Sequence, residues 1–153
     1  MRSVLQRVER ASVEVEGRTV AAIGYGMLVL LGVAAGDSEA DAAWTARKLA
    51  EVRIFPDEAG RFNRGVTELG GAALVVSQFT LFGNTRHGRR PGFTGAAPPE
   101  LAAPLVERVA ALLRERGVPT QSGEFGAKMR VALVNDGPVT LLFDSRAGEP
   151  SQT

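Results

Sequence analysis

The apolar run from Met27 to Val33 constrains the fold of this chain most, because it contains no polar side chain. A strand with one wet face alternates apolar and polar residues, whereas this run does not alternate, so we expect a strand covered on both faces. The run from Ala72 to Val76 has the same character. Such strands need other layers of secondary structure to cover them. The two runs therefore predict a layered α/β domain.

Two stretches have the spacing of amphipathic helices. The first spans about residues 38 to 53, with a capping oxygen on Asp37 or Ser38 and a stop at Pro56. The second carries its apolar residues at Leu101, Leu105, Val109 and Leu112, and Gly117 is expected to cap it. Because Pro104 has no N–H for the carbonyl of Glu100, we expect a kinked or late-starting first turn there.

The remaining strand signals flank these elements. Residues 3–8 and 12–16 predict a β-hairpin with a tight turn at Glu16-Gly17-Arg18. Three further strands are expected at residues 118–120, 129–134 and 139–143. With 153 residues the chain is the size of one domain. We expect that domain to span residues 1–145 and the polar residues 146–153 to form a flexible tail.

Composition excludes several kinds of chemistry. There is no cysteine and only one histidine, His87, which lies in a cationic loop, so thiol catalysis and serine triads are poorly supported. The acidic residues Asp37, Glu39 and Asp41 are better explained by the amino end of a helix than by a metal site. No metal or other cofactor is therefore expected. Without a spanning apolar run or a signal-peptide pattern, the cytoplasm is the expected compartment.

Three segments could carry chemistry or binding. Ser77-Gln78-Phe79-Thr80 follows a strand, where free backbone N–H groups can form an oxyanion hole or the hydroxyls can merely satisfy local groups. Asn135-Asp136-Gly137-Pro138 is a turn signal, and the residues alone favour a trans Gly-Pro bond. The net charge of +1 does not indicate nucleic-acid binding, but Arg86, Arg89 and Arg90 cluster before Phe93. That loop is either a phosphate contact or a solvated turn.

Two of these motifs together resemble the D-aminoacyl-tRNA deacylase family. They are Ser77-Gln78-Phe79-Thr80-Leu81 and Asn135-Asp136-Gly137-Pro138-Val139-Thr140, in this order. Further similar positions are Leu5-Gln6-Arg7-Val8, Ala11-Ser12-Val13, Leu28 to Val33, Arg53-Ile54-Phe55 and Arg90-Pro91. The resemblance implies a single α/β domain with mixed and antiparallel, barrel-like β-sheets and two main helices.

The resemblance also implies a site shared by two chains. It implies a homodimer in which a cis Gly137-Pro138 bond enters the partner's pocket and Arg7 braces that turn. It further implies that the amides of Gln78 and Phe79 face the substrate carbonyl, and that Phe125 and Met129 border the pocket.

The implied activity is hydrolysis of D-aminoacyl-tRNA to tRNA and D-amino acid. Because glycine has no side chain to exclude, glycyl-tRNA mischarged on alanine tRNA is an expected second substrate. Water is the expected nucleophile, with the terminal ribose 2′-hydroxyl as proton relay, and Thr80 as a covalent nucleophile is the competing idea. The alternatives are a related deacylase acting on L-alanyl noncognate tRNA and a tRNA-binding module without turnover.

Overall fold

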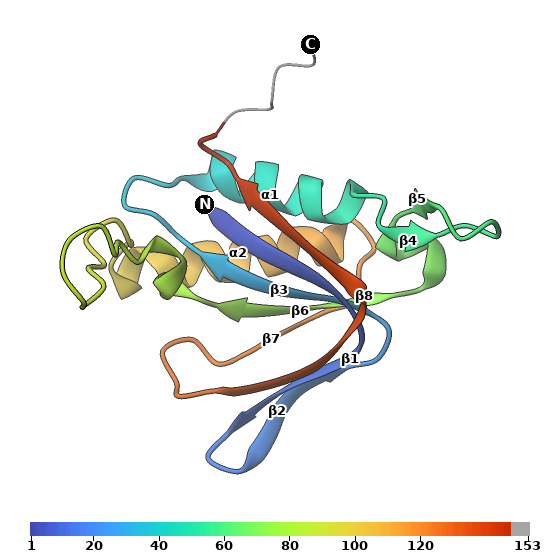
Figure 1. Cartoon of the computed structure of the whole chain (residues 1–153), viewed down its shortest axis with the longest axis horizontal. Coiled ribbons are helices and arrows are strands. Elements are labelled where there is room, and N and C mark those ends of the chain that lie inside the picture. The colour runs from blue at the N-terminus through green and yellow to red at the C-terminus, as the bar shows by residue number, and fades with distance from the viewer. Residues whose placement is uncertain (148–153) are drawn as a thin grey trace.

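The computed structural model describes residues 1–147 and shows a strongly bent, barrel-like sheet with two helices packed along one side (Figure 1). In chain order the elements are β1 (Arg2–Val15), β2 (Arg18–Ile23), β3 (Gly26–Gly32), α1 (Glu39–Glu51), β4 (Phe55–Pro56), β5 (Phe62–Arg64), η1 (Val66–Leu69), β6 (Ala72–Ser77), η2 (Phe79–Phe82), α2 (Pro99–Glu115), β7 (Thr120–Ser122) and β8 (Arg130–Asp144). The predicted mixed α/β class with two main helices is confirmed.

The two apolar runs form adjacent strands of the main sheet, and both are buried on both faces as predicted. The strand order is β2-β1-β3-β6-β7, with β8 paired to β1, and β3 and β6 are parallel neighbours. Met27, Val29 and Leu31 face a core shared with both helices, whereas Leu28 joins a second core formed with residues of β1, β2 and β6. Burial on both faces explains why the run has no alternation.

The first and last strands form one long antiparallel ladder. The two predicted segments at 3–8 and 12–16 are a single strand, β1, which pairs with β8 from Arg2 opposite Asp144 to Glu14 opposite Arg130. The turn into β2 has positive φ at Glu16 and Gly17, which matches a tight hairpin turn. The ladder is interrupted between Gln6 and Val8, and this interruption accommodates the Gly-Pro motif.

The starts of the two helices agree with the predictions for α1 and differ in one respect for α2. Ser38 caps α1, and its amide donates to the Asp41 carboxylate at 2.8 Å, so the acidic residues serve the helix end as expected. Burial alone would raise the pKa of Asp41, but hydrogen bonds from Ser145 and Ser38 outweigh it and lower the pKa below its ordinary value. For the second helix we expected a kinked or a late-starting first turn, and the late start is wrong, because α2 begins at Pro99 and includes Pro104.

The start of the predicted tail is attached to the domain. The amide of Ser145 donates to the Met1 carbonyl at 2.9 Å. Arg146 donates through Nε to Asp37 at 3.0 Å and through Nη2 to the carbonyl of Ala35 at 2.6 Å. These contacts hold the chain as far as Arg146, whereas residues 148–153 of the predicted tail lie outside the described residues.

Candidate active site

The Ser77-Gln78-Phe79-Thr80 segment leaves the sheet at the end of β6 and enters the 3₁₀ helix η2. The amide of Gln78 donates to the Leu31 carbonyl at 2.8 Å, which closes the β3–β6 ladder. That amide is therefore engaged, and the expectation that it faces a substrate carbonyl is wrong. Phe79 and Thr80 are the first two residues of η2, and the first N–H groups of a helix have no carbonyl partner within the helix. Within residues 1–147 neither amide has a backbone partner.

A pocket of about 590 Å³ lies beside this segment. Its wall includes Ser77, Gln78, Phe79, Phe125 and Met129, so five of the expected site residues meet around one cavity. The rest of the wall is mainly apolar and comes from β3, β6, α2 and the start of β8, with residues such as Leu31, Val76, Ala102 and Val131. Such a concave apolar site with few polar groups is typical of a ligand pocket.

The loop that carries Phe125 is attached to β6 by a backbone hydrogen bond. The amide of Gly123 donates to the Val75 carbonyl at 2.9 Å, next to the exit of β6. A Cβ on Gly123 would meet Met129 Sδ at 2.7 Å, so the glycine permits Met129 to pack closely against the loop. This explains how residues distant in sequence reach Ser77.

The side chains at the pocket offer little acid–base chemistry. Gln78 Nε2 donates to Thr80 Oγ1, and within residues 1–147 no imidazole or carboxylate is hydrogen-bonded to that hydroxyl. His87 is exposed in the basic loop. A hydroxyl needs an adjacent base to become a nucleophile, so the geometry gives Thr80 no activation by the described protein groups. In the same part of the chain, no cluster of three or more His, Cys, Asp or Glu side chains is placed to hold a metal ion.

The Asn135 to Thr140 motif forms a closed bulge inside β8 instead of the predicted turn between two strands. The Asn135 side chain accepts from the Val139 amide at 2.8 Å and donates to the Val139 carbonyl at 3.2 Å, so it clamps the base of the bulge. At the tip, Gly137 has φ of +156°, and a Cβ there would lie 2.5 Å from the Val139 nitrogen. The Gly137-Pro138 bond is cis, as the resemblance implies and contrary to the reading from the residues alone.

Arg7 braces this bulge from β1, as the resemblance implies. Its buried guanidinium donates through Nε to the Asp136 carbonyl at 2.9 Å and lies 3.1 Å from the Asp136 carboxylate. Nη1 donates to the Ile54 carbonyl at 2.6 Å, and the Phe62 ring lies 5.4 Å from the guanidinium carbon. The main-chain anchor at Ile54 and the contact with Phe62 were not predictable from local sequence.

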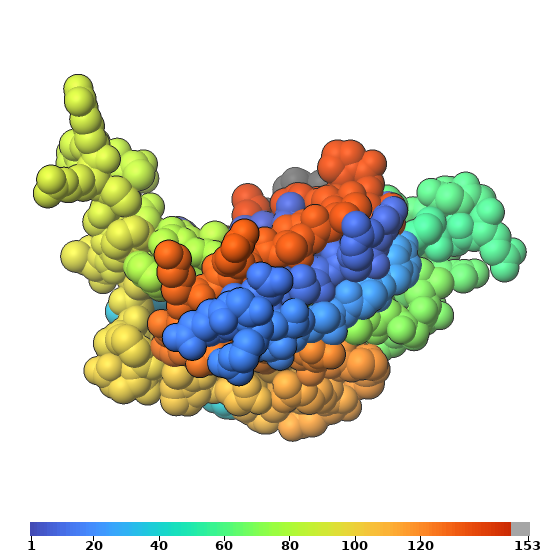
Figure 2. All heavy atoms as spheres, turned by 90° about the horizontal axis from the view of Figure 1, so that it is seen from below, coloured from blue at the N-terminus to red at the C-terminus, as the bar shows by residue number. Residues whose placement is uncertain are grey.

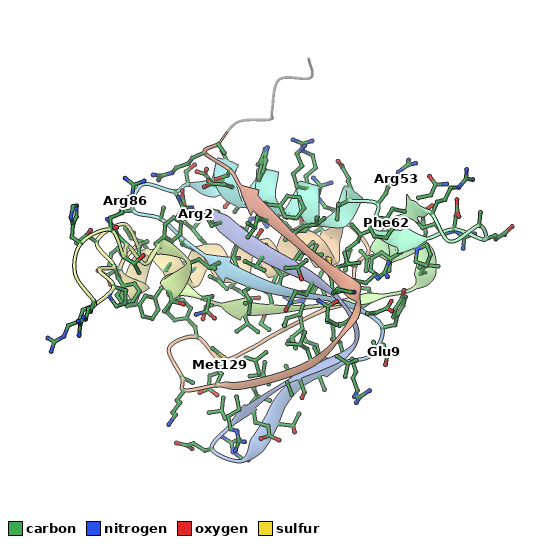
Figure 3. All side chains as sticks on the ribbon, viewed as in Figure 1. Arg2, Glu9, Arg53, Phe62, Arg86 and Met129 are labelled. Atoms are coloured by element: carbon green, nitrogen blue, oxygen red, sulfur yellow. The ribbon has the colours of Figure 1, made fainter. Side chains whose placement is uncertain are left out.

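The bulge and the pocket lie at different ends of the sheet. The bulge interrupts the β1–β8 ladder next to Arg7. Across the sheet from Arg7 lie Met27 on β3 and then Ala73 on β6, so the bulge is level with Ala73. Ala73 is four residues before Ser77, which corresponds to about 13 Å along a strand. Figure 3 labels Met129 at the pocket and Phe62 beside the Arg7 brace, and the two lie toward opposite ends of the view. One chain thus presents both features but does not join them.

The basic loop is attached to the pocket by an aromatic contact. Asn84 and Gly92 exchange backbone hydrogen bonds of 2.8 and 2.9 Å and so close the loop between them. Next to this closure, Phe93 packs edge-on against Phe79 with ring centroids 5.0 Å apart. The loop stands out from the body as the yellow-green projection in Figure 2, and its arginines, Arg86, Arg89 and Arg90, are exposed.

Comparisons with known proteins agree on one family. Residues 4–144 match the family model described as D-Tyr-tRNA(Tyr) deacylase. The "D-aminoacyl-tRNA deacylase" of Roseiflexus castenholzii is 61% identical over 145 residues, covering 95% of this chain and 92% of that protein. The protein of the same name in Geobacter sulfurreducens is 55% identical over 151 residues, covering 99% of each chain.

Solved structures share the fold. A "c-Myc DNA Unwinding Element Binding Protein" has a TM-score of 0.87 with 38% identity, covering 94% of this chain and 98% of that one. A structure described as a probable eukaryotic D-amino acid tRNA deacylase has a TM-score of 0.81 with 20% identity, covering 93% and 97%, and supports the fold alone. The barrel-like α/β architecture expected from the resemblance is confirmed.

Proposed function

Because the chain belongs to the D-Tyr-tRNA(Tyr) deacylase family and hydrolyses the ester bond of D-aminoacyl-tRNA in translational proofreading, we propose that its catalytic site is the pocket beside η2. The observation that carries this proposal is the meeting of Ser77, Gln78 and Phe79 with Phe125 and Met129 around one cavity. The substrate ester would lie against η2, with the amino-acid side chain directed by the pocket wall.

A second copy of the chain completes this site. Gly137 and Pro138 are exposed at the tip of the bulge, and the register separates them from their own pocket. A homodimer with two-fold symmetry lets each tip enter the pocket of its partner, because such an interface presents the same surface patch on both subunits. The partner's tip then forms the wall that reads the configuration of the amino acid.

The same geometry supports one position for the contact between copies. In a reciprocal exchange the two-fold axis passes midway between a tip and its own pocket. Along β1 the bulge lies opposite the interruption between Gln6 and Val8, and the pocket residue Leu31 pairs with Ser3, so the middle of this span lies near the Val4–Leu142 pair. Leu142 is 79% exposed there, and a groove of about 700 Å³ beside it is lined by Arg2, Val4 and Leu81. Apart from β1, no strand within residues 1–147 pairs with β8. We assign this face to the dimer contact.

The chemistry depends on the main chain. The amides of Phe79 and Thr80 donate to the ester carbonyl oxygen and stabilise the charge that develops on it, at about 2.7–4 kcal/mol for each such donor. Water attacks the carbonyl carbon, the bond to the ribose 3′-oxygen breaks, and the water proton passes to that oxygen through the 2′-hydroxyl of the terminal adenosine. The released products are free tRNA and the D-amino acid.

A pocket wall made of main-chain atoms selects D-aminoacyl esters by excluding L side chains. Backbone atoms cannot change rotamer, so a wall built by Gly137 and Pro138 rejects an L side chain by steric conflict and tolerates a D side chain. Glycine has no side chain on either face and escapes this exclusion. We therefore include glycyl-tRNA mischarged on alanine tRNA among the substrates.

The tRNA body is held by the basic loop in this proposal. Arg86, Arg89 and Arg90 are exposed on a closed loop whose neighbour Phe93 contacts Phe79 at the pocket, so phosphates near the acceptor end lie within their reach.

The substrate places the enzyme in the cytoplasm, where translation occurs. None of the described helices is long and apolar enough to cross a membrane.

The first experiment compares matched D-tyrosyl-tRNA, L-tyrosyl-tRNA and glycyl-tRNA by following ester loss against the uncatalysed rate. We expect rapid loss of the D-ester and the glycyl ester, and no acceleration for the L-ester. Loss of the L-ester alone would favour the related deacylase that acts on L-alanyl noncognate tRNA. Binding of tRNA without any ester loss would indicate a binding module.

Thr80 separates the two chemical routes. Thr80→Ala retains the backbone amide, so it keeps substantial activity if water attacks directly. A substrate that lacks the terminal 2′-hydroxyl reacts slowly with the wild-type enzyme. Trapping of an acyl group on Thr80 would instead support the covalent route.

Leu142→Asp tests the dimer contact. A charge on this exposed apolar face opposes its burial against a second copy, so the variant should become monomeric by light scattering and lose activity. Leu101→Asp is the matched control, because Leu101 is also a largely exposed leucine but lies on α2. A Leu142→Asp protein that stays dimeric would place the contact elsewhere.

A further inference from the structure

The turn between β2 and β3 carries Tyr25, which touches the brace of the bulge. Its hydroxyl donates to the Asp136 carboxylate at 3.2 Å, and its ring packs edge-on against Phe55 with centroids 5.5 Å apart. The same carboxylate pairs with Arg7, so Asp136 is held from two elements, β1 and the β2–β3 turn. Tyr25 is the only tyrosine of the chain.

Asp136 immediately precedes the Gly-Pro tip, so its orientation sets the path of the tip. The Asp136 carboxyl is one-third exposed and would exchange its contacts for water without a second anchor. Arg7 contacts both the carbonyl and the carboxylate, whereas Tyr25 contacts only the carboxylate. The phenol therefore limits rotation of the Asp136 side chain while Arg7 holds its main chain.

We propose that Tyr25 is a positioning residue for D-over-L selection, which it supports by fixing Asp136 and, through Asp136, the Gly137-Pro138 tip. This inference rests on the proposed role of that tip in the partner's pocket. Tyr25 does not line the pocket beside η2 and acts through Asp136. The aromatic contact with Phe55, a fully buried residue, keeps the phenol in place as a rigid support.

Tyr25→Phe removes the hydroxyl and keeps the ring against Phe55. We expect the ratio of kcat/KM for D-tyrosyl-tRNA over L-tyrosyl-tRNA to fall about three- to tenfold, the range set by one hydrogen bond. Gln121→Ala is the matched control: Gln121 Oε1 accepts from the Ala22 amide on β2 at 2.9 Å, and its loss leaves Asp136 untouched. The control should lose stability without a change in that ratio.

The single tyrosine gives a spectroscopic readout of the same contact. Burial raises the pKa of Tyr25 above its ordinary value, Asp136 raises it further through its charge and hydrogen bond, and Arg7 opposes them. The phenolate absorbance should therefore appear at higher pH than for free tyrosine. Asp136→Asn should move that titration to lower pH and reduce the D-over-L ratio together with it.

The outcomes distinguish this inference from the proposed function. An unchanged ratio in a dimeric Tyr25→Phe protein would overturn the role of Tyr25 and leave the pocket assignment intact. A wild-type protein without any D preference would instead remove the proposed selection by the tip. A lower ratio in both Tyr25→Phe and Gln121→Ala would reveal a general loss of order and would also overturn the specific role.

Discussion

The side-chain clamp at Asn135 can be tested by a change that preserves its size. Asn135→Asp keeps the acceptor for the Val139 amide but removes the two donations of Nδ2, at 3.2 Å to the Val139 carbonyl and 3.3 Å to Thr140 Oγ1. It also places a carboxylate oxygen opposite that carbonyl. The bulge therefore loses the clamp on one side only.

The expected cost follows from these contacts. Two neutral hydrogen bonds contribute about 2 kcal/mol together, and the stronger charged acceptor for the Val139 amide offsets about 1 kcal/mol. The facing carboxylate and carbonyl oxygens add about 1 kcal/mol of repulsion, so we expect a net loss of about 2 kcal/mol in the free energy of unfolding. In a domain of this size that corresponds to a Tm lower by about 4–8 °C.

Denaturant unfolding at pH 7 measures this loss as a lower midpoint with an unchanged slope. The charge-assisted bond from the Val139 amide and the repulsion act in opposite directions on the pKa of the introduced carboxyl, but its protonated form can also donate to the Val139 carbonyl, which restores one lost hydrogen bond and raises the pKa in the folded state. The variant's deficit is therefore smallest below the unfolded-state pKa and grows as pH rises through the folded-state pKa. Asn84→Asp is the control, since among residues 1–147 the Asn84 side chain uses only its acceptor, toward the Arg86 amide. A deficit below about 0.5 kcal/mol that did not vary with pH would refute the clamp.

Three further changes follow from the same geometry. Gly137→Ala places a Cβ 2.5 Å from the Val139 nitrogen at a φ of +156°, so denaturation should show a loss of about 2–3 kcal/mol. The folded state raises the pKa of Tyr25, whose phenol faces Asp136 and Arg7, so the free energy of unfolding should fall as pH rises above about 10. Calorimetry should find a smaller fall of the free energy of unfolding with pH in Tyr25→Phe. Arg89→Ala should weaken tRNA binding, and the slope of the logarithm of the tRNA association constant against the logarithm of the salt concentration should be smaller in magnitude by about 0.7–0.9. Arg18→Ala, at an exposed arginine on β2, is the control and should leave tRNA binding titrations unchanged.

The elements with strong periodicity were predictable from sequence. The runs at Met27 and Ala72 predicted strands buried on both faces, and of the two expected caps, Asp37 and Ser38, the structure has Ser38 at the start of α1. For α2, Pro104 left a late start and a kinked first turn open, and the structure excludes the late start, because the helix begins at Pro99 and continues through Pro104. Local patterns therefore gave the layers more reliably than the boundaries.

The site was only partly predictable because its contacts depend on the register of distant strands. The turn signal at Asn135 was real, but its pairing with β1 converts the turn into a bulge within one strand. The Gln78 amide is occupied by Leu31, a long-range partner that no local motif reveals. Likewise, nothing near Tyr25 in sequence indicates that it meets Asp136.

The ladder between β1 and β8 also determines when this protein can fold during its synthesis. β1 ends at Val15 and its partner β8 begins at Arg130, so the intervening chain must be translated first. At about 5–20 residues per second, β1 waits roughly 6–23 s on the ribosome before that edge can be paired. During this interval the N–H and C=O groups on that edge of β1 are open to pairing with other chains. Synthesis speed and cellular crowding thus influence the yield of the enzyme before its stability does.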